Sequence, residues 1–169
     1  GLGYSPESWE ALAGHSKAKG FNAEVMVLAG LLKLRDNGTH YDLFRHRVMF
    51  SIYSVTGKVI AFAGRKMSST DPSPKYVNSP ETDLYKKSDV LFGLFQAKNS
   101  IKKADKVYMT EGYTDVITLS QAGIENVVAS SGTALTPGQI KLLKRFTDNV
   151  TVVYDGDAAG IKASLRGID

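Results

Sequence analysis

The 169-residue chain contains 43% hydrophobic residues and no cysteine, which allows a sizeable core and excludes disulfide bonds and cysteine-based zinc sites. No apolar run approaches the roughly 18 residues that a membrane span needs, so we expect no membrane partner and a cytoplasmic protein. Residues 1–103 carry 15 Lys/Arg against 9 Asp/Glu, whereas residues 104–169 carry 6 against 8. This asymmetry favours a groove for a polyanion in the first part and an acidic site in the second.

Residues 1–103 are predicted to form a basic α+β subdomain that begins with two helices. Ser5 is suited to cap the first helix, with Pro6 at its first position and Gly14 at its end. Asn22 is suited to cap the second helix. Trp9 follows the helical period of the first segment, so we expect its side chain in the core.

A β-hairpin is predicted next, from apolar runs at residues 48–53 and 58–63 on either side of a Gly-containing turn. A long irregular stretch follows at residues 68–83, and loops of this length in a compact domain are usually functional or disordered. Its middle combines a cation, an aromatic ring and an amide, at Lys75, Tyr76 and Asn78. This combination is suited to binding phosphate and stacking a base.

Residues 104–169 alternate strands with helices, a pattern typical of a parallel α/β sheet flanked by helices. A capping box of Thr136 and Gln139 opens the last complete helix. The strand at residues 150–153 is an unbroken β-branched run, so we expect it to be central and buried on both faces. The other strands are predicted at residues 106–110 and 126–129.

Carboxylates follow two of these strands. Asp155 and Asp157 come directly after the strand at 150–153, and Glu111 comes directly after the strand at 106–110. Parallel strands end at one edge of a sheet, so we expect the three side chains to converge on a divalent cation such as Mg²⁺. Asp115 could face the same space, although an acidic residue in the first turn of a helix also has a simple dipole explanation. Asp-Gly is equally an ordinary turn signal.

Six motifs occur in the order typical of one known family. In the first part they are Gly1-Leu2-Gly3-Tyr4, Tyr41-Asp42-Leu43-Phe44-Arg45-His46-Arg47-Val48-Met49-Phe50 and Lys75-Tyr76-Val77-Asn78-Ser79-Pro80-Glu81-Thr82. In the second part they are Glu111-Gly112-Tyr113-Thr114-Asp115-Val116-Ile117, Gly132-Thr133-Ala134-Leu135-Thr136 and Asp155-Gly156-Asp157-Ala158-Ala159-Gly160. Together they cover essentially the whole chain, which resembles the catalytic core of bacterial DnaG-type primases. The resemblance implies a Toprim domain at residues 104–169.

The resemblance also implies a function, namely template-directed synthesis of short RNA primers from ribonucleoside triphosphates on single-stranded DNA. It assigns Glu111, Asp155 and Asp157 to a catalytic Mg²⁺ centre, in which Mn²⁺ can substitute, with Asp115 as an additional ligand. Whether Glu111 binds metal or relays a proton stays open. The positions implied to hold template or nucleotide phosphates are Arg45, Arg65, Lys75, Tyr76, Asn78 and Lys87. In the full-length protein the replicative helicase would be a partner, within the bacterial replication machinery.

The family pattern extends beyond both ends of this sequence. A zinc-binding module would precede Gly1, and another strand with an Asp-Pro-Asp pair would follow Asp169. We therefore expect no zinc here, an incomplete metal site and little primer synthesis by this chain alone. The alternatives are DNA cleavage and rejoining by another Toprim enzyme, a non-catalytic module that binds single-stranded DNA, and a phosphatase with an Asp nucleophile.

Overall fold

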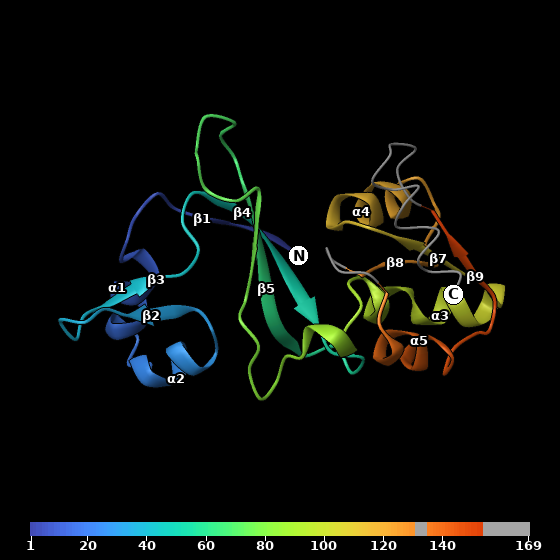
Figure 1. Ribbon diagram of the computed structural model, residues 1–169, viewed down its shortest axis with the longest axis horizontal. Coiled ribbons are helices and arrows are strands. Elements are labelled where there is room, and N and C mark those ends of the chain that lie inside the picture. The colour runs from blue at the N-terminus through green and yellow to red at the C-terminus, as the bar shows by residue number, and fades with distance from the viewer. Residues whose placement is uncertain (131–134, 154–169) are drawn as a thin grey trace. The chain divides into compact units, whose positions relative to one another are not determined.

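The computed structural model describes residues 1–130 and 135–153, which belong to two compact units (Figure 1). The first unit comprises Gly1–Ile52 and Val59–Lys86. The second comprises Tyr53–Lys58, at the tip of the hairpin, and the chain from Lys87 onward. The predicted division into an N-terminal subdomain at residues 1–103 and a Toprim domain at residues 104–169 stays a prediction. Within the described ranges no helix is long and apolar enough to cross a membrane.

The first unit is built on a four-stranded sheet with the order β1-β4-β5-β6. Its strands are β1 (Leu2–Ser5), β4 (Arg47–Tyr53), β5 (Val59–Lys66) and β6 (Tyr76–Asn78). β1 pairs antiparallel with β4, and β6 pairs antiparallel with β5. β4 and β5 form the predicted hairpin, which closes where the Ser54 amide donates to the Lys58 carbonyl at 2.8 Å. The hairpin prediction is confirmed, whereas strand β6 lies inside the stretch expected to be irregular.

The helix predicted to begin at Ser5 is wrong in its position. Residues 2–5 form strand β1, in which Leu2 lies opposite Phe50, and the first helix is α1 (Ala11–Ala18). Pairing with β4 therefore overrides the local capping signal. The second helix, α2 (Ala23–Leu28), is capped as predicted, because the Asn22 side chain accepts from the Glu24 amide at 2.7 Å. A small antiparallel pair, β2 (Leu32–Leu34) and β3 (His40–Asp42), completes the helical end of this unit.

The second unit contains a parallel three-stranded sheet with the order β8-β7-β9. The strands are β7 (Val107–Thr110), β8 (Val127–Ala129) and β9 (Val150–Val152). The helices are η1 (Lys87–Asp89), α3 (Leu94–Ala104), α4 (Tyr113–Gln121) and α5 (Pro137–Leu143). This architecture confirms the predicted fold class, a parallel sheet flanked by helices after an α+β part.

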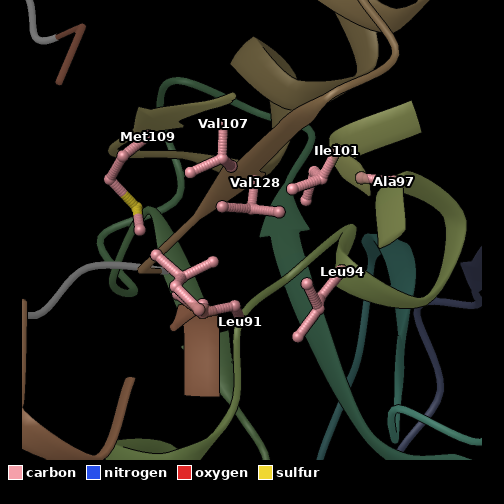
Figure 2. Packing of buried hydrophobic residues seen from close by; sticks show 8 residues of the cluster. Leu91, Leu94, Ala97, Ile101, Val107, Met109 and Val128 are labelled. Carbon is pink, nitrogen blue, oxygen red and sulfur yellow. The ribbon is translucent and has the colours of Figure 1, made fainter. Parts of the chain in front are cut away.

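The core of the second unit joins helix α3 to the sheet (Figure 2). Leu94, Ala97 and Ile101 lie three or four residues apart and so share one face of α3. They pack in one buried cluster with Val107 and Met109 of β7. β7 is bonded to a strand on each side, and its Val107 and Met109 side chains are completely buried. The position of β7 is thereby fixed, and with it the residue that follows it.

Strand β9 differs from the prediction that it would be central and buried on both faces. In the described sheet it pairs with β7 alone, and Val150 and Val152 are 42% and 36% exposed. The β-branched run identified a strand correctly but could not specify how many neighbours the strand has. The central strand of the described sheet is β7.

Candidate metal centre and nucleic-acid interface

Two adjacent strand ends define the acidic edge of the second unit. β7 and β9 are parallel, with Met109 opposite Val152, and the Val153 amide donates to the Met109 carbonyl at 2.8 Å. The chain therefore leaves β9 beside the end of β7, where Glu111 follows Thr110. Glu111 is half-buried, and its Oε1 atom is shielded from solvent. A carboxylate in this position faces the edge of an α/β sheet at which ligands usually bind.

Asp115 has a structural role at this edge. Its Oδ2 atom accepts from the Gly112 amide at 2.9 Å, which caps the N-terminus of α4. A Cβ atom on Gly112 would lie 3.0 Å from the same oxygen, so the glycine allows the carboxylate to approach closely. The helix-dipole explanation thus accounts for one oxygen of Asp115, while metal binding through this residue stays a prediction.

Asp155 and Asp157 lie outside the described residues, so their convergence with Glu111 stays a prediction. Within residues 1–130 and 135–153, no group of three or more His, Cys, Asp or Glu side chains could hold a metal ion. The described part of the edge supplies Glu111 and Asp115, and a metal centre that also includes the two aspartates stays a prediction.

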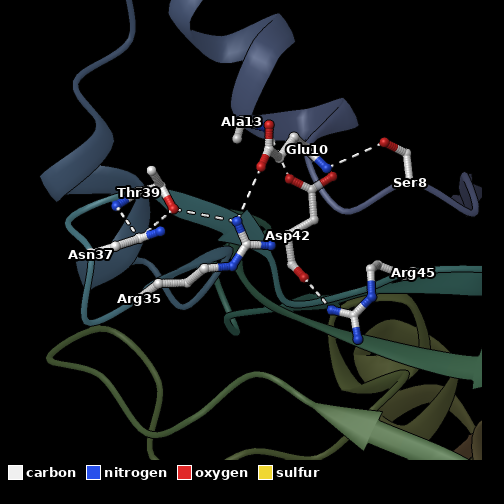
Figure 3. Close-up of polar contacts among 8 residues, drawn as sticks. All are labelled: Ser8, Glu10, Ala13, Arg35, Asn37, Thr39, Asp42 and Arg45. Carbon is white, nitrogen blue, oxygen red and sulfur yellow. Dashed lines mark hydrogen bonds and ion pairs between the residues drawn. The ribbon is translucent and has the colours of Figure 1, made fainter.

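In the first unit, Arg45 lies in a cluster of cations and aromatic rings. Its guanidinium carbon lies 3.6 Å from the centre of the Trp9 ring, and its Nη1 atom donates to the Asp42 carbonyl at 2.7 Å (Figure 3). Trp9 is 55% exposed, so the prediction that it belongs to the core is wrong. Its indole packs against Arg45 and the Tyr41 ring, contacts that helical periodicity could not reveal.

A pocket of about 520 Å³ lies against this cluster. Three cationic side chains line it, from Lys33, Arg45 and Arg47, with the aromatic rings of Trp9 and Tyr41. The carboxylates of Glu7 and Asp71 also line the pocket, so its charge is positive but mixed. Exposed aromatic faces beside cations are suited to a single-stranded polyanion with unpaired bases.

Strands β5 and β6 carry the next predicted binding residues. Arg65 pairs with Tyr76, and Ala63 pairs with Asn78. Arg65 and Lys75 are exposed, and the Lys75 ammonium lies 5.9 Å from the centre of the Tyr76 ring. The structure therefore places Arg65, Lys75 and Tyr76 near one another, at one end of the β5–β6 pair.

Lys87 belongs to the second unit, where it begins the short helix η1. The side-chain Nε2 atom of Gln139 donates to the Lys87 carbonyl at 3.3 Å and to the Val90 carbonyl at 2.9 Å. Gln139 is fully buried, and its side-chain Oε1 atom accepts from the backbone amide of Thr136, as expected for the predicted capping box. The capping box is confirmed, but its sequence pattern gave no sign that Gln139 also binds the segment of Lys87.

Arg47 lies two residues after Arg45, so a regular strand would place the two side chains on the same face. The strand does not include Arg45, because His46 has a φ of 50° and the regular strand begins at Arg47. Arg47 is 4% exposed. Burial lowers the pKa of its guanidinium, and Arg45 lowers it further while Asp71 raises it, but an arginine side chain stays charged.

Comparison with protein families gives two matches that together span nearly the whole chain. Residues 1–98 match the DNA primase catalytic core, N-terminal domain, and residues 105–169 match the Toprim domain. The DNA primase of Clostridium acetobutylicum is 48% identical over 170 residues, which cover 100% of this chain and 28% of the relative. The DNA primase of Pseudomonas aeruginosa is 42% identical, with 100% and 25% covered. The chain thus spans about a quarter of the length of these relatives.

Solved structures agree with the family matches. The RNA polymerase domain of Mycobacterium tuberculosis primase DnaG has a TM-score of 0.91 and 38% identity, covering 99% of this chain and 57% of that one. A DnaG primase catalytic domain bound to single-stranded DNA has a TM-score of 0.86 and 40% identity, covering 99% and 51%. The resemblance read from the six motifs is confirmed. This chain belongs to the family of DNA primase catalytic cores, with the N-terminal domain of that core followed by a Toprim domain.

Proposed function

We propose that the chain is the part of a DNA primase that synthesises short RNA primers from ribonucleoside triphosphates on a single-stranded DNA template. The observation that carries this proposal is the side-by-side, parallel course of β7 and β9. This course brings Glu111 and the chain leading to Asp155 to one edge of the sheet.

Chain geometry supports convergence of the carboxylates. The Val153 amide is bonded to Met109, two residues before Glu111. Because consecutive Cα atoms lie about 3.8 Å apart, the Cα atom of Asp155 is within about 7.6 Å of that of Val153 in any conformation. This short connection supports the proposal that Asp155 lies near the end of β7. Side chains of this length could share one cation with Glu111.

The donor set fits Mg²⁺ or Mn²⁺. Carboxylate oxygens are the ligands that these hard cations prefer, and Glu111, Asp155 and Asp157 would hold the ion. Asp115 could add only its second oxygen, because the first caps α4. When bound, the metal would acidify the primer 3′-hydroxyl and neutralise charge on the transferred phosphoryl group. Glu111 would bind the ion or accept the proton of the 3′-hydroxyl. Because Glu111 is half-buried, the access of water to its carboxylate would be limited.

The first unit would hold the template. Arg45, Arg65 and Lys75 supply cationic groups at its surface, and Tyr76 with Asn78 supplies a ring and an amide on β6. Lys87 would bind nucleotide or template phosphate from the second unit. Support comes from the relatives, since one solved primase domain is bound to single-stranded DNA and another to double-stranded DNA. We also propose that the replicative helicase is a partner of the full-length protein, which would act at the replication machinery in the bacterial cytoplasm.

A chimera provides the test. Residues 1–169 replace the matching segment of the Clostridium acetobutylicum DNA primase, and primer synthesis is measured on single-stranded template with ribonucleotides and Mg²⁺. We expect activity in the chimera and a loss of about 100-fold or more on Asp155→Asn with Asp157→Asn, with template binding retained. Full activity of the doubly substituted chimera would contradict the catalytic role of the two aspartates. A chimera that binds the template but makes no primers, even without the substitutions, would favour a module that only binds DNA.

A further inference from the structure

The connection between β5 and β6, residues 67–75, is held by cations from the sheet rather than by regular structure. Lys66, at the end of β5, donates from its Nζ atom to the carbonyls of Asp71 and Ser73. The Lys66 amide donates to the Lys75 carbonyl at 3.0 Å, which closes the connection at its base. Within it, the Ser73 amide donates to Asp71 Oδ1 at 2.8 Å and forms a local turn.

Arg47 makes the most extensive contacts with this connection. Its Nη2 atom donates to the Ser73 hydroxyl at 2.7 Å. Its Nη1 atom donates to the carbonyls of Pro74 at 3.0 Å, Gly64 at 3.2 Å and Lys75 at 3.5 Å. The Pro74 and Lys75 carbonyls belong to the two residues immediately before Tyr76, and the Gly64 carbonyl belongs to β5. A planar guanidinium presents five donors on separate nitrogen atoms, so it can reach acceptors that lie further apart than those around the single ammonium nitrogen of lysine.

Gly64 provides the space that this reach requires. A Cβ atom at Gly64 would lie 2.9 Å from Arg47 Cδ and 2.9 Å from a ring carbon of Phe44. The arginine stem therefore passes directly over the glycine. This observation is independent of the hydrogen bonds, and it links a residue of β5 to the same arrangement.

We propose that Arg47 is a positioning residue that fixes the backbone of Ser73–Lys75 and so presents Lys75 and Tyr76 to the template. Unlike Arg45, which is half-buried, Arg47 is 4% exposed and donates mainly to protein carbonyls. The Arg47 guanidinium binds the connection between β5 and β6, and the Lys75 ammonium binds the nucleic acid. The inference rests on the proposed function for the identity of the ligand, but the arrangement of the connection can be tested without it.

The test uses Arg47→Lys, which keeps the charge, and Gly64→Ala, which displaces the arginine without changing any charge. Gly3→Ala is the matched control, because a Cβ there meets only Met49 Cβ, at an ordinary 3.7 Å. In hydrogen exchange, both test variants should raise exchange at residues 67–75 about tenfold while strand β4 stays protected. The Gly3→Ala variant should leave the exchange of residues 67–75 unchanged. Unchanged exchange at residues 67–75 in Arg47→Lys would overturn the proposal.

Binding of a fluorescent single-stranded oligonucleotide supplies the second readout. Arg47→Lys should weaken binding about tenfold, and Lys75→Ala should then add little, although it weakens binding clearly when Arg47 is present. Additive effects, or near wild-type binding by Arg47→Lys, would mean that Arg47 acts as a simple charge and would overturn the proposal. If the unsubstituted protein binds no oligonucleotide, the proposed function fails, whereas the exchange result still decides the role of Arg47.

Discussion

Two segments that carry predicted binding lysines are held in different ways. Residues 67–75 of the first unit, which end at Lys75, are bound by the charged side chains of Arg47 and Lys66. The segment Lys87–Val90 of the second unit is bound by the neutral side chains of Gln139 and Thr136, whose hydroxyl donates to the Ser88 carbonyl. In each segment a glycine permits the close approach of the side chain that binds it. In the first segment this is Gly64, and in the second it is Gly138, where a Cβ atom would lie 2.9 Å from the Ser88 carbonyl oxygen.

The two segments differ in the charge of the buried side chain that binds them. Gln139 is completely buried and neutral, so its hydrogen bonds carry no cost of burying a charge and should not respond to pH or salt. Arg47 is buried with its charge, and the partly solvated Asp71 lies near enough to influence its pKa. We therefore expect the first segment to respond to pH and substitution of charge, and the second to respond mainly to loss of packing and hydrogen bonds.

The largest effect should come from Gln139→Leu. The substitution removes the partner of the Thr136 amide and of the Lys87 and Val90 carbonyls, so the free energy of unfolding should fall by roughly 3 kcal/mol. Urea denaturation followed by circular dichroism measures it. Lys141→Met, on the exposed side of the same helix, is the control and should change stability by less than about 0.5 kcal/mol. Equal stability of the two variants would show that the neutral contacts contribute little.

Substitution of either lysine should reduce the salt dependence of oligonucleotide binding. Lys75→Ala and Lys87→Ala should each reduce the slope of log affinity against log salt by about 0.7, the value expected for one phosphate contact with a single strand. Their effects should add, because different side chains hold the two segments. Oligonucleotide anisotropy at several salt concentrations measures this. An unchanged slope for either variant would remove that lysine from the proposed interface.

The carboxylate of Asp71 should make the first segment sensitive to acid. Hydrogen bonds from the backbone and side chain of Ser73 lower the pKa of Asp71 below its ordinary 3.8. The stabilising contribution is therefore present above pH 3.8 and is lost as the pH falls through the lowered pKa. Carboxyl NMR titration should show this midpoint, and Ser73→Ala should move it back toward 3.8. A midpoint at or above 3.8 in the unsubstituted protein would contradict the account.

At alkaline pH the prediction concerns Tyr85, which lies just before the segment of Lys87 and is 2% exposed. Burial, with a smaller contribution from Glu81, raises the pKa of the Tyr85 phenol to about 12. The corresponding stability is complete below pH 10.0 and is lost as the pH rises toward 12. Tyrosinate absorbance should lose its most alkaline component in Tyr85→Phe. Retention of that component in the variant would assign it to another tyrosine.

Local patterns in the sequence predicted much of the fold. The hairpin, the Asn22 cap, the capping box of Thr136 and the alternation of strands with helices all depend on residues near one another in the chain. The errors arise where distant pairing decides. Residues 2–5 form a strand because β4 lies beside them, and β9 is partly exposed because it has one described neighbour.

The candidate site was predictable to a similar depth. The position of Glu111 at the end of β7 follows from the order of strands and their parallel pairing. The contacts of Arg47 with Gly64 and the connection, and those of Gln139 with the Lys87 segment, were not predictable, because the partners lie 17 to 28 and 49 to 52 residues away. Only the glycines at positions 64 and 138 could have signalled a close approach, and a glycine does not identify what approaches it.

The most direct test of the central claim, that Glu111 and the two aspartates bind one divalent cation, is a Mn²⁺ titration followed by electron paramagnetic resonance. Glu111→Gln, the pair Asp155→Asn with Asp157→Asn, and the combination of all three form a double-mutant cycle. We predict that each part weakens Mn²⁺ binding at least about tenfold and that the combination costs little more than the larger of the two. Unchanged Mn²⁺ affinity in Glu111→Gln, or independent additive losses, would contradict a shared site.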